Sequence, residues 1–136
     1  MNIEAFLLCD AATDQQGKLN ILGAFDNIWA KELPTTHPAC AITARIRFEK
    51  EKDEAGNHPI RINIIDEDGK PIGPNLQGTI NVNVGGDMDS SITNIVLNIQ
   101  RLKLENYGQY RIDLEVDGNM KASLPLHVRE IPNQPK

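Results

Sequence analysis

From residue 39 onward, apolar side chains recur at every second position, which is the period of a β-strand with one buried face and one wet face. The pattern is clearest over five segments, 42–48, 60–64, 80–84, 95–99 and 110–116. After Arg101 the apolar positions change from odd to even numbers, which indicates a bulge or a strand that changes sheet. Asp117-Gly118 predicts a tight hairpin. The last strand follows it, with an inward row of Met120, Ala122, Leu124, Leu126 and Val128 and with Pro125 on its outward row.

The first third of the chain is less regular. In residues 3–9, apolar side chains occupy both odd and even positions, as in a strand covered on both faces. A second apolar segment extends from Lys18 to Trp29 after a polar turn. We expect these two segments to form a hairpin. A helix over residues 3–12 is the competing interpretation, because few of these residues are β-branched. Residues 33–38 are interpreted as a linker between strands.

Sustained helical periodicity is missing from the rest of the sequence, so we predict about eight strands and little helix. This pattern is typical of an all-β fold in which two antiparallel sheets pack face to face as a β-sandwich. The length of 136 residues suits one domain. We assign residues 1–130 to that domain and expect residues 131–136 to form a flexible C-terminal tail.

The segment Asn106–Ile112 has the form of a tyrosine corner. In this motif a tyrosine near the start of a strand hydrogen-bonds back across the preceding loop, which gives Tyr110 a structural role. Immunoglobulin domains carry a cysteine two residues after that tyrosine, whereas this chain has Ile112. The motif favours an immunoglobulin-like sandwich with a core of plain hydrocarbon.

A wider resemblance covers nearly the whole chain. The segments 5–12 (AFLLCDAA), 17–26 (GKLNILGAFD) and 108–111 (GQYR) resemble a family of small uncharacterised bacterial β-sandwich proteins. The resemblance implies a bacterial source and the sandwich fold. It implies no catalytic residues, because that family has no assigned activity.

Composition narrows the classes of partner. The 14 Lys and Arg residues against 19 Asp and Glu residues give a net charge of −5, which argues against general affinity for nucleic acid. A membrane span needs about 18 consecutive apolar residues, and the runs here are much shorter. The N-terminal residues also lack the basic start of a signal peptide, so we expect a cytoplasmic protein. Cys9 and Cys40 are then expected to be buried structural thiols.

The sequence lacks the motifs that are typical of enzyme active sites. Its three serines, Ser90, Ser91 and Ser123, lie outside any nucleophile-elbow motif, and glycine-rich phosphate loops are missing. Carboxylate pairs among Asp66, Asp68 and Glu115 are conceivable for glycoside hydrolysis, although nothing in the sequence marks one as buried. We therefore expect a non-enzymatic protein, and the alternative is a small carboxylate- or metal-dependent hydrolase.

Metal binding rests on the acidic loops. His37, His58 and His127 are far apart in sequence without metal-ligand spacing, which is typical of surface histidines. If the strands alternate up and down, seven acidic residues gather at one end of the sandwich: Asp14, Glu51, Asp53, Glu54, Asp87, Asp89 and Asp117. Asp87, Asp89 and Asp117 are weak calcium candidates, since turns favour aspartate in any case. We expect neither a bound metal nor a cofactor.

Surface contact remains as the leading function. Trp29 is the sole tryptophan and either fills the core or anchors a contact, with the core as the favoured interpretation. Sandwich edges and the segment 74–78 offer further surface for association. We predict a non-enzymatic binding or assembly module of unknown ligand, able to form a homo-oligomer or to bind another protein.

Overall fold

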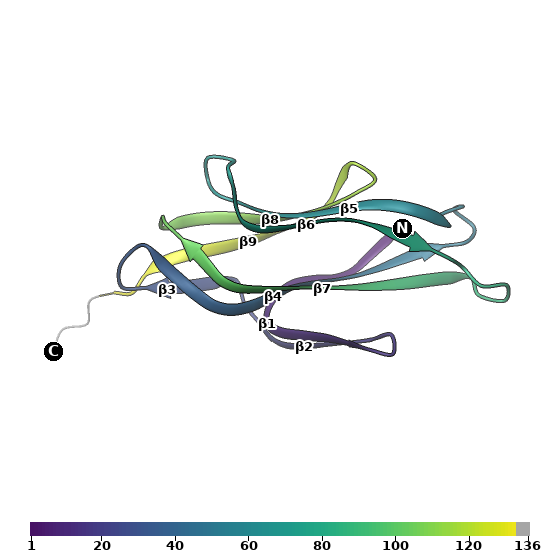
Figure 1. The fold of residues 1–136 in the computed structure, drawn as a ribbon, viewed down its shortest axis with the longest axis horizontal. Coiled ribbons are helices and arrows are strands. Elements are labelled where there is room, and N and C mark those ends of the chain that lie inside the picture. Colours follow the sequence, from purple (N-terminus) through teal and green to yellow (C-terminus); the bar gives the residue numbers. More distant parts are fainter. Residues whose placement is uncertain (133–136) are drawn as a thin grey trace.

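The computed structural model describes residues 1–132, which form nine β-strands in two sheets (Figure 1). Sheet A has four strands in the order β2 (Lys18–Ala24), β1 (Asn2–Gln15), β4 (Thr35–Glu49) and β7 (Ser90–Leu104). Sheet B has five strands in the order β3 (Asn27–Ala30), β9 (Asn119–Glu130), β8 (Gly108–Val116), β5 (Gly56–Ile65) and β6 (Pro71–Val82). The all-β prediction is confirmed, and the sheets pack as layers of a sandwich-like fold.

The core lies between the two sheets and is built from the predicted alternating rows. Ile42 of sheet A and Ile62 and Leu114 of sheet B each have 0% exposure. Burying a side chain of this size stabilises the fold by about 1.5–3 kcal/mol. The two-residue period therefore identified the inward face of β4, β5 and β8 correctly.

The change of parity after Arg101 is confirmed, but its origin is not a one-sided bulge. The register between β4 and β7 is the same on either side of this point, with Cys40 opposite Ile99 and His37 opposite Leu102. Arg101 has a φ of 57°. Because the register is unchanged, the set of alternate residues that points to the core changes at this position in both strands. Leu102 consequently points into the core with 1% exposure.

The predicted strand from Lys18 to Trp29 is in fact two strands, which accounts for nine strands instead of eight. The chain crosses from sheet A to sheet B at Phe25 and Asp26. The Phe25 N–H donates to Leu8 O (2.9 Å), and the His127 N–H donates to Asp26 O (2.8 Å). After the crossing, β3 runs parallel to β9, so the prediction of purely antiparallel sheets is wrong for this pair.

The β1–β2 hairpin bends away from the rest of sheet A and lies beneath β4 and β7 as a third layer (Figure 1). Beyond Cys9 the strand β1 leaves β4, and Ala12 packs with Ala41 and Val96 in a small apolar cluster on the outer face of sheet A. Thr43 in β4 is fully buried there, and its hydroxyl donates to Ile95 O (2.8 Å). The two-sided apolar pattern of residues 3–9 thus belongs to a strand, and the helix interpretation of residues 3–12 is wrong.

The tyrosine corner is present. Tyr110 is 3% exposed, and its hydroxyl donates to Asn106 O (2.9 Å) and accepts from Asn106 N–H (3.3 Å). Tyr110 is therefore a structural residue, as predicted.

Residues 74–78, which were predicted as surface for association, belong to β6. Two local predictions are corrected. Residues 35–38 belong to β4 instead of a linker, because residues 35–37 pair with the end of β7. Met120 is 54% exposed, since it lies beside the β8–β9 turn where the strands leave the core. Ile131 is still held, by donation from its N–H to Ala30 O (2.9 Å), and residues 133–136 of the predicted tail lie outside the described residues. Residues 1–132 contain no helix long and apolar enough to cross a bilayer.

Candidate functional site

Trp29 lies at the edge of sheet B and is 54% exposed, so the favoured prediction that it fills the core is wrong. Its neighbours Ile28 and Ala30 face the core with 7% and 4% exposure. Strand alternation then directs the side chain of Trp29 to the outer face of the sheet. Two apolar neighbours thus fix β3 and present the indole to solvent.

Polar side chains hold the surroundings of Trp29 in place. Arg129 is opposite Trp29 in the parallel pairing of β3 with β9, and its guanidinium carbon lies 6.0 Å from the centre of the indole ring. The Arg129 Nε donates to Asn27 Oδ1 (2.6 Å), and Asn27 Nδ2 donates to Asp26 Oδ1 (2.5 Å). We call Asp26, Asn27, Trp29 and Arg129 the tryptophan edge.

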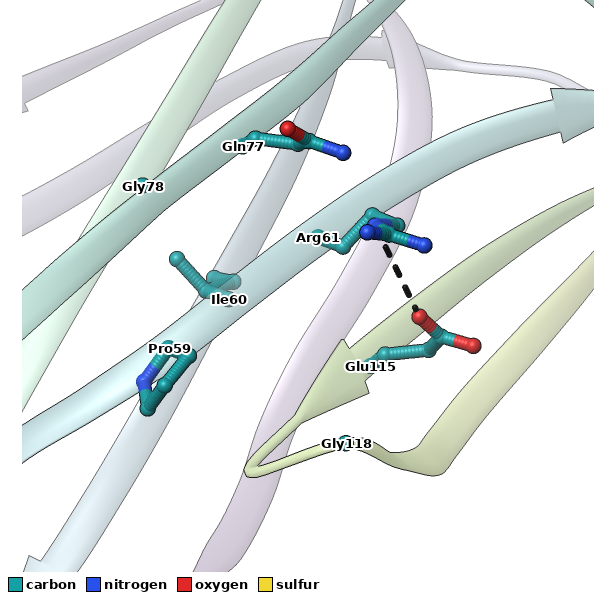
Figure 2. A pocket seen from close by; sticks show the side chains of 7 residues that line it. All are labelled: Pro59, Ile60, Arg61, Gln77, Gly78, Glu115 and Gly118. Atoms are coloured by element: carbon teal, nitrogen blue, oxygen red, sulfur yellow. Dashed lines mark ion pairs between the residues drawn. The ribbon is translucent and has the colours of Figure 1, made fainter.

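A shallow groove of about 440 Å³ lies on the outer face of sheet B (Figure 2). Arg61 stands at its centre, 4.0 Å from Glu115 Oε2 and beside Gln77 of β6. The guanidinium of Arg61 is half exposed, with 50% of its side-chain surface accessible. Glu115, one of the predicted hydrolase carboxylates, is therefore the counter-ion of an arginine on an open sheet face.

Asp66, another of the predicted hydrolase carboxylates, and two of the serines have structural partners. Asp66 Oδ1 accepts from the backbone N–H groups of Asp68 (3.0 Å) and Lys70 (2.9 Å), which closes the β5–β6 turn. The Ser90 hydroxyl accepts from Arg47 Nη1 (2.7 Å), and the Ser123 hydroxyl donates to Asp113 Oδ1 (2.7 Å). These contacts place the two hydroxyl groups beside an arginine and a carboxylate instead of beside a histidine base.

Asp117 and His58 form the best-ordered polar cluster at the acidic end. The His58 Nδ1 lies 2.8 Å from Asp117 Oδ2, and its Nε2 lies 2.7 Å from Glu54 O. The ring also stacks on Phe48 with a centroid distance of 4.8 Å. Burial opposes a charge on His58, but the hydrogen bonds to Glu54 and Asp117 outweigh it and raise the pKa of the imidazole. His58 is thus a half-buried structural residue instead of the surface histidine that was predicted.

Two of the other predicted acidic residues, Glu51 and Asp89, line a second groove of about 470 Å³ together with Glu49, Lys50 and Ser90. Lys50 lies among them, and its Nζ donates to Gly86 O (3.2 Å). Over residues 1–132 the structure holds no group of three or more His, Cys, Asp or Glu side chains arranged for a metal ion. Asp87 and Asp89 belong to the β6–β7 loop, and Asp117 is committed to His58.

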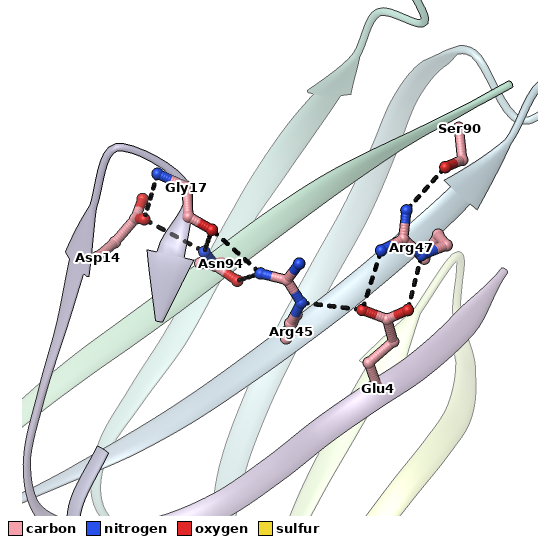
Figure 3. A network of polar contacts seen from close by, with 7 residues as sticks. All are labelled: Glu4, Asp14, Gly17, Arg45, Arg47, Ser90 and Asn94. Carbon is pink, nitrogen blue, oxygen red and sulfur yellow. Dashed lines mark hydrogen bonds and ion pairs between the residues drawn. The ribbon is translucent and has the colours of Figure 1, made fainter. Parts of the chain in front are cut away.

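A polar network that the sequence did not reveal covers the outer face of sheet A (Figure 3). Glu4 of β1 receives hydrogen bonds from Arg45 Nε (2.9 Å) and Arg47 Nε (2.6 Å) of β4. Both hydrogen bonds lower the pKa of the Glu4 carboxyl group, and the bond from Arg47 has the larger effect. Both arginines lie on the polar face of the predicted alternation over residues 42–48, but their shared partner depends on the β1–β4 register, which the sequence leaves open.

Both cysteines are free and buried, as predicted. Cys40 belongs to the main core and Cys9 to the small cluster on the other face of sheet A, so the thiols lie on opposite faces. Burial raises the pKa of Cys9 and raises that of Cys40 to about 11, which makes both thiols poor nucleophiles.

Comparisons with known proteins give a family but no activity. Residues 4–129 match the model of a family of unknown function, DUF6941. The chain belongs to this family. No curated protein sequence matches it. Among solved structures it is similar to a β-glucuronidase from glycoside hydrolase family 2, with a TM-score of 0.41, 20% identity and 69% of this chain covered. The match spans 10% of that enzyme's chain, so the protein corresponds to about a tenth of its length.

Proposed function

We propose that this member of the family is a non-enzymatic binding module that contacts a protein partner through the tryptophan edge. The observation that carries the proposal is the 54% exposure of Trp29 beside Arg129. Tryptophan and arginine are the residue types most enriched among side chains that dominate the energy of protein interfaces. An exposed tryptophan of this kind, on a strand whose other side chains are at least partly buried and with an arginine beside it on β9, is a ready contact point.

The order of the tryptophan edge strengthens the proposal. Arg129 is fixed by Asn27, and Trp29 is fixed by the buried residues on either side of it. Binding then immobilises few additional side chains, which reduces the entropic cost of association. A partner suited to this surface offers an apolar pocket for the indole ring and a carboxylate for the Arg129 guanidinium.

Site-specific photo-crosslinking in the native host tests the proposal. A photoreactive phenylalanine analogue replaces Trp29, and the matched control carries it at Met88, which is exposed to a similar extent (61%) in the β6–β7 loop. We expect one protein to be linked from position 29 and not from position 88. With that protein purified, Trp29→Ala is expected to raise the Kd by about 30-fold or more, the effect of losing ~2 kcal/mol at an interface hot spot. Equal crosslinking from both positions, or an unchanged Kd, would contradict the proposal.

The hydrolase alternative has less support. A general acid among two catalytic carboxylates needs a raised pKa. Glu54, one of the acidic-loop residues, has a pKa displaced in the opposite direction. For Glu54, burial acts upward, but hydrogen bonds from the N-terminal ammonium and the Glu49 N–H lower the pKa overall.

We further propose a cytoplasmic location and an immunoglobulin-like relationship for the sandwich. The free thiols of Cys9 and Cys40 suit a reducing compartment. The tyrosine corner at Tyr110 supports the relationship to immunoglobulin-like domains.

A further inference from the structure

The outer edge of β2 is the least protected strand edge of the molecule. Sheets avoid edge-to-edge association through charges, prolines, irregular backbone or very short edge strands. In sheet B, β3 has four residues, and β6 carries Pro71 and Pro74. In sheet A, residues 90–100 of β7 are uncharged, but the apolar side chains among them are at least partly buried. Residues 19–24 of β2 contain neither a charge nor a proline, and the large apolar side chains of Ile21 and Leu22 are exposed, while Leu19 is partly buried.

The apolar surface of β2 is held rigidly for contact. Leu22 is 69% exposed and Ile21 is 36% exposed. At the tip of the β1–β2 hairpin, Gly17 O accepts from Arg45 Nη1 (3.1 Å) and from Asn94 Nδ2 (3.1 Å), which fastens the hairpin to sheet A (Figure 3). At the other end of β2, the Phe25 N–H donates to Leu8 O (2.9 Å), which holds that end of the strand against β1. The edge therefore needs little ordering before another strand can pair with it.

Opposite charges lie on either side of this neutral strand. Lys18 precedes Leu22 by four residues, and Asp26 follows it by four. Both side chains are exposed, and neither takes part in an ion pair among residues 1–132. When two copies of this segment lie antiparallel, the positive end of each one faces the negative end of the other. This pattern identifies the fitting partner as a second copy of the chain.

We propose that β2 pairs antiparallel with β2 of a second copy about a two-fold axis at Leu22. An isologous interface of this kind joins the two four-stranded sheets A into one continuous sheet. The register sets Leu22 beside its own counterpart and brings Lys18 of each copy towards Asp26 of the other. A short strand edge buries less area than a permanent dimer, so the association is weak and depends on concentration.

The one irregularity in β2 has a local cause. Gly23 has a φ of 68°, and a Cβ atom there would lie 2.5 Å from Asp10 Oδ2. Glycine is thus required for packing within the hairpin and still leaves the outer edge open. The proposed dimer shares one residue with the tryptophan edge, Asp26, but it makes no use of Trp29, which belongs to sheet B.

Sedimentation equilibrium of the full chain from about 10 μM to 1 mM tests the proposal. We expect a monomer–dimer equilibrium in this range, and Leu22→Lys should raise the dimer Kd at least tenfold, because it sets two like charges together at the axis. Met88→Lys is the matched control, since Met88 is also highly exposed (61%) but lies in the β6–β7 loop. Trp29→Ala should leave the dimer Kd unchanged, which separates this proposal from the proposed function.

Charge reversal tests the register. Lys18→Glu or Asp26→Lys alone creates two like-charged contacts, and each should raise the Kd about fivefold or more. The two single variants mixed together regain both attractive contacts and should form a heterodimer with the wild-type Kd. A wild-type chain that is monomeric at 1 mM would overturn the proposal, as would a dimer that neither Leu22→Lys nor the charge reversals weaken. Unchanged melting temperatures of the variants confirm that each remains folded.

Discussion

At the residue scale, Tyr110 illustrates how one polar group can order a loop. Its hydroxyl satisfies both the carbonyl and the N–H of Asn106, four residues earlier, while the ring fills the core. A buried aromatic residue with a satisfied hydroxyl group gains packing energy without the penalty of an unpaired polar atom. The loop before β8 is thereby fixed at its closest approach to the core.

Replacing Tyr110 by phenylalanine tests this role. We expect Tyr110→Phe to lower the free energy of unfolding by about 1 kcal/mol, since two hydrogen bonds are lost while the ring remains. Tyr107→Phe is the graded control, because it removes one longer bond (3.2 Å) to Ala30 O, which keeps its bond from the Ile131 N–H. Urea unfolding provides the measurement. A larger loss for Tyr107→Phe than for Tyr110→Phe would contradict the assignment of the corner.

Residue-level predictions failed where long-range contacts decide exposure. Trp29 lies in an apolar segment that resembles a core strand, but β3 has a neighbour on one side only, and its outer face has no covering layer. Conversely, Thr43 is polar and was predicted to face outward, which it does, but the β1–β2 hairpin covers it completely. Alternation gives the face of a sheet to which a side chain points, whereas coverage of that face depends on distant segments.

At the scale of elements, His58 joins the start of β5 to the loop before it and to the β8–β9 turn. Both ring nitrogens face acceptors, Asp117 on one side and Glu54 O on the other. A neutral imidazole has one N–H and can satisfy one of these acceptors, whereas the imidazolium donates to both. The protonated form is therefore the one that completes this junction.

The junction should make stability depend on pH. The pKa of His58 is raised above its ordinary 6.5 in the folded state, so its contribution is complete below that value and is lost as the pH rises through the folded-state pKa. Each unit by which the pKa is raised contributes about 1.4 kcal/mol. We expect the unfolding free energy to fall between about pH 6 and 8, and to fall less in His58→Gln.

Chemical denaturation at the two pH values provides the measurement, and His127→Gln is the control that leaves the junction in place. The upper limit of about pH 8 keeps most of the thiols of the unfolded chain protonated, and the wild type and the variants contain the same two cysteines. An identical pH dependence in wild type and His58→Gln would contradict the role of His58.

Strand-level prediction succeeded where the signal is local. The Asp117-Gly118 turn is confirmed between β8 and β9, with φ values of 56° and 79°. The division of residues 18–29 into β2 and β3 was missed, because the crossing at Phe25 and Asp26 is stabilised by hydrogen bonds to Leu8 and His127. A short window of sequence around residues 25 and 26 contains no information about hydrogen-bond partners that are so distant along the chain.

At the scale of the whole molecule, the two candidate surfaces occupy different sheets. Trp29, Asn27 and Arg129 of the tryptophan edge belong to β3 and β9 of sheet B, Asp26 lies where the chain crosses between the sheets, and the β2 edge belongs to sheet A. One copy can therefore contact a partner through Trp29 while it pairs with a second copy through Leu22. A dimer would then present two tryptophan edges and bind a repeated or dimeric partner with increased avidity.

The distribution of charge over the molecule leads to a final prediction about calcium. Calcium takes six to eight oxygen ligands, and several acidic groups at the predicted end already have partners. Asp117 pairs with His58, and Asp14 accepts from Asn94 Nδ2 (3.2 Å). Asp89 lines a groove with Lys50, and the Lys50 ammonium group, which opposes a cation, donates to the carbonyl of Gly86, the residue before Asp87.

We therefore expect about 5 mM calcium to shift the melting temperature no more than the same concentration of magnesium, and chelation by EDTA to leave it unchanged. Screening of the net charge of −5 affects both cations alike, which makes magnesium the appropriate reference. Calcium-specific stabilisation that disappears in an Asp87→Asn, Asp89→Asn double variant would contradict this expectation. It would also identify the β6–β7 loop as a binding site, because those two carboxylates alone were changed.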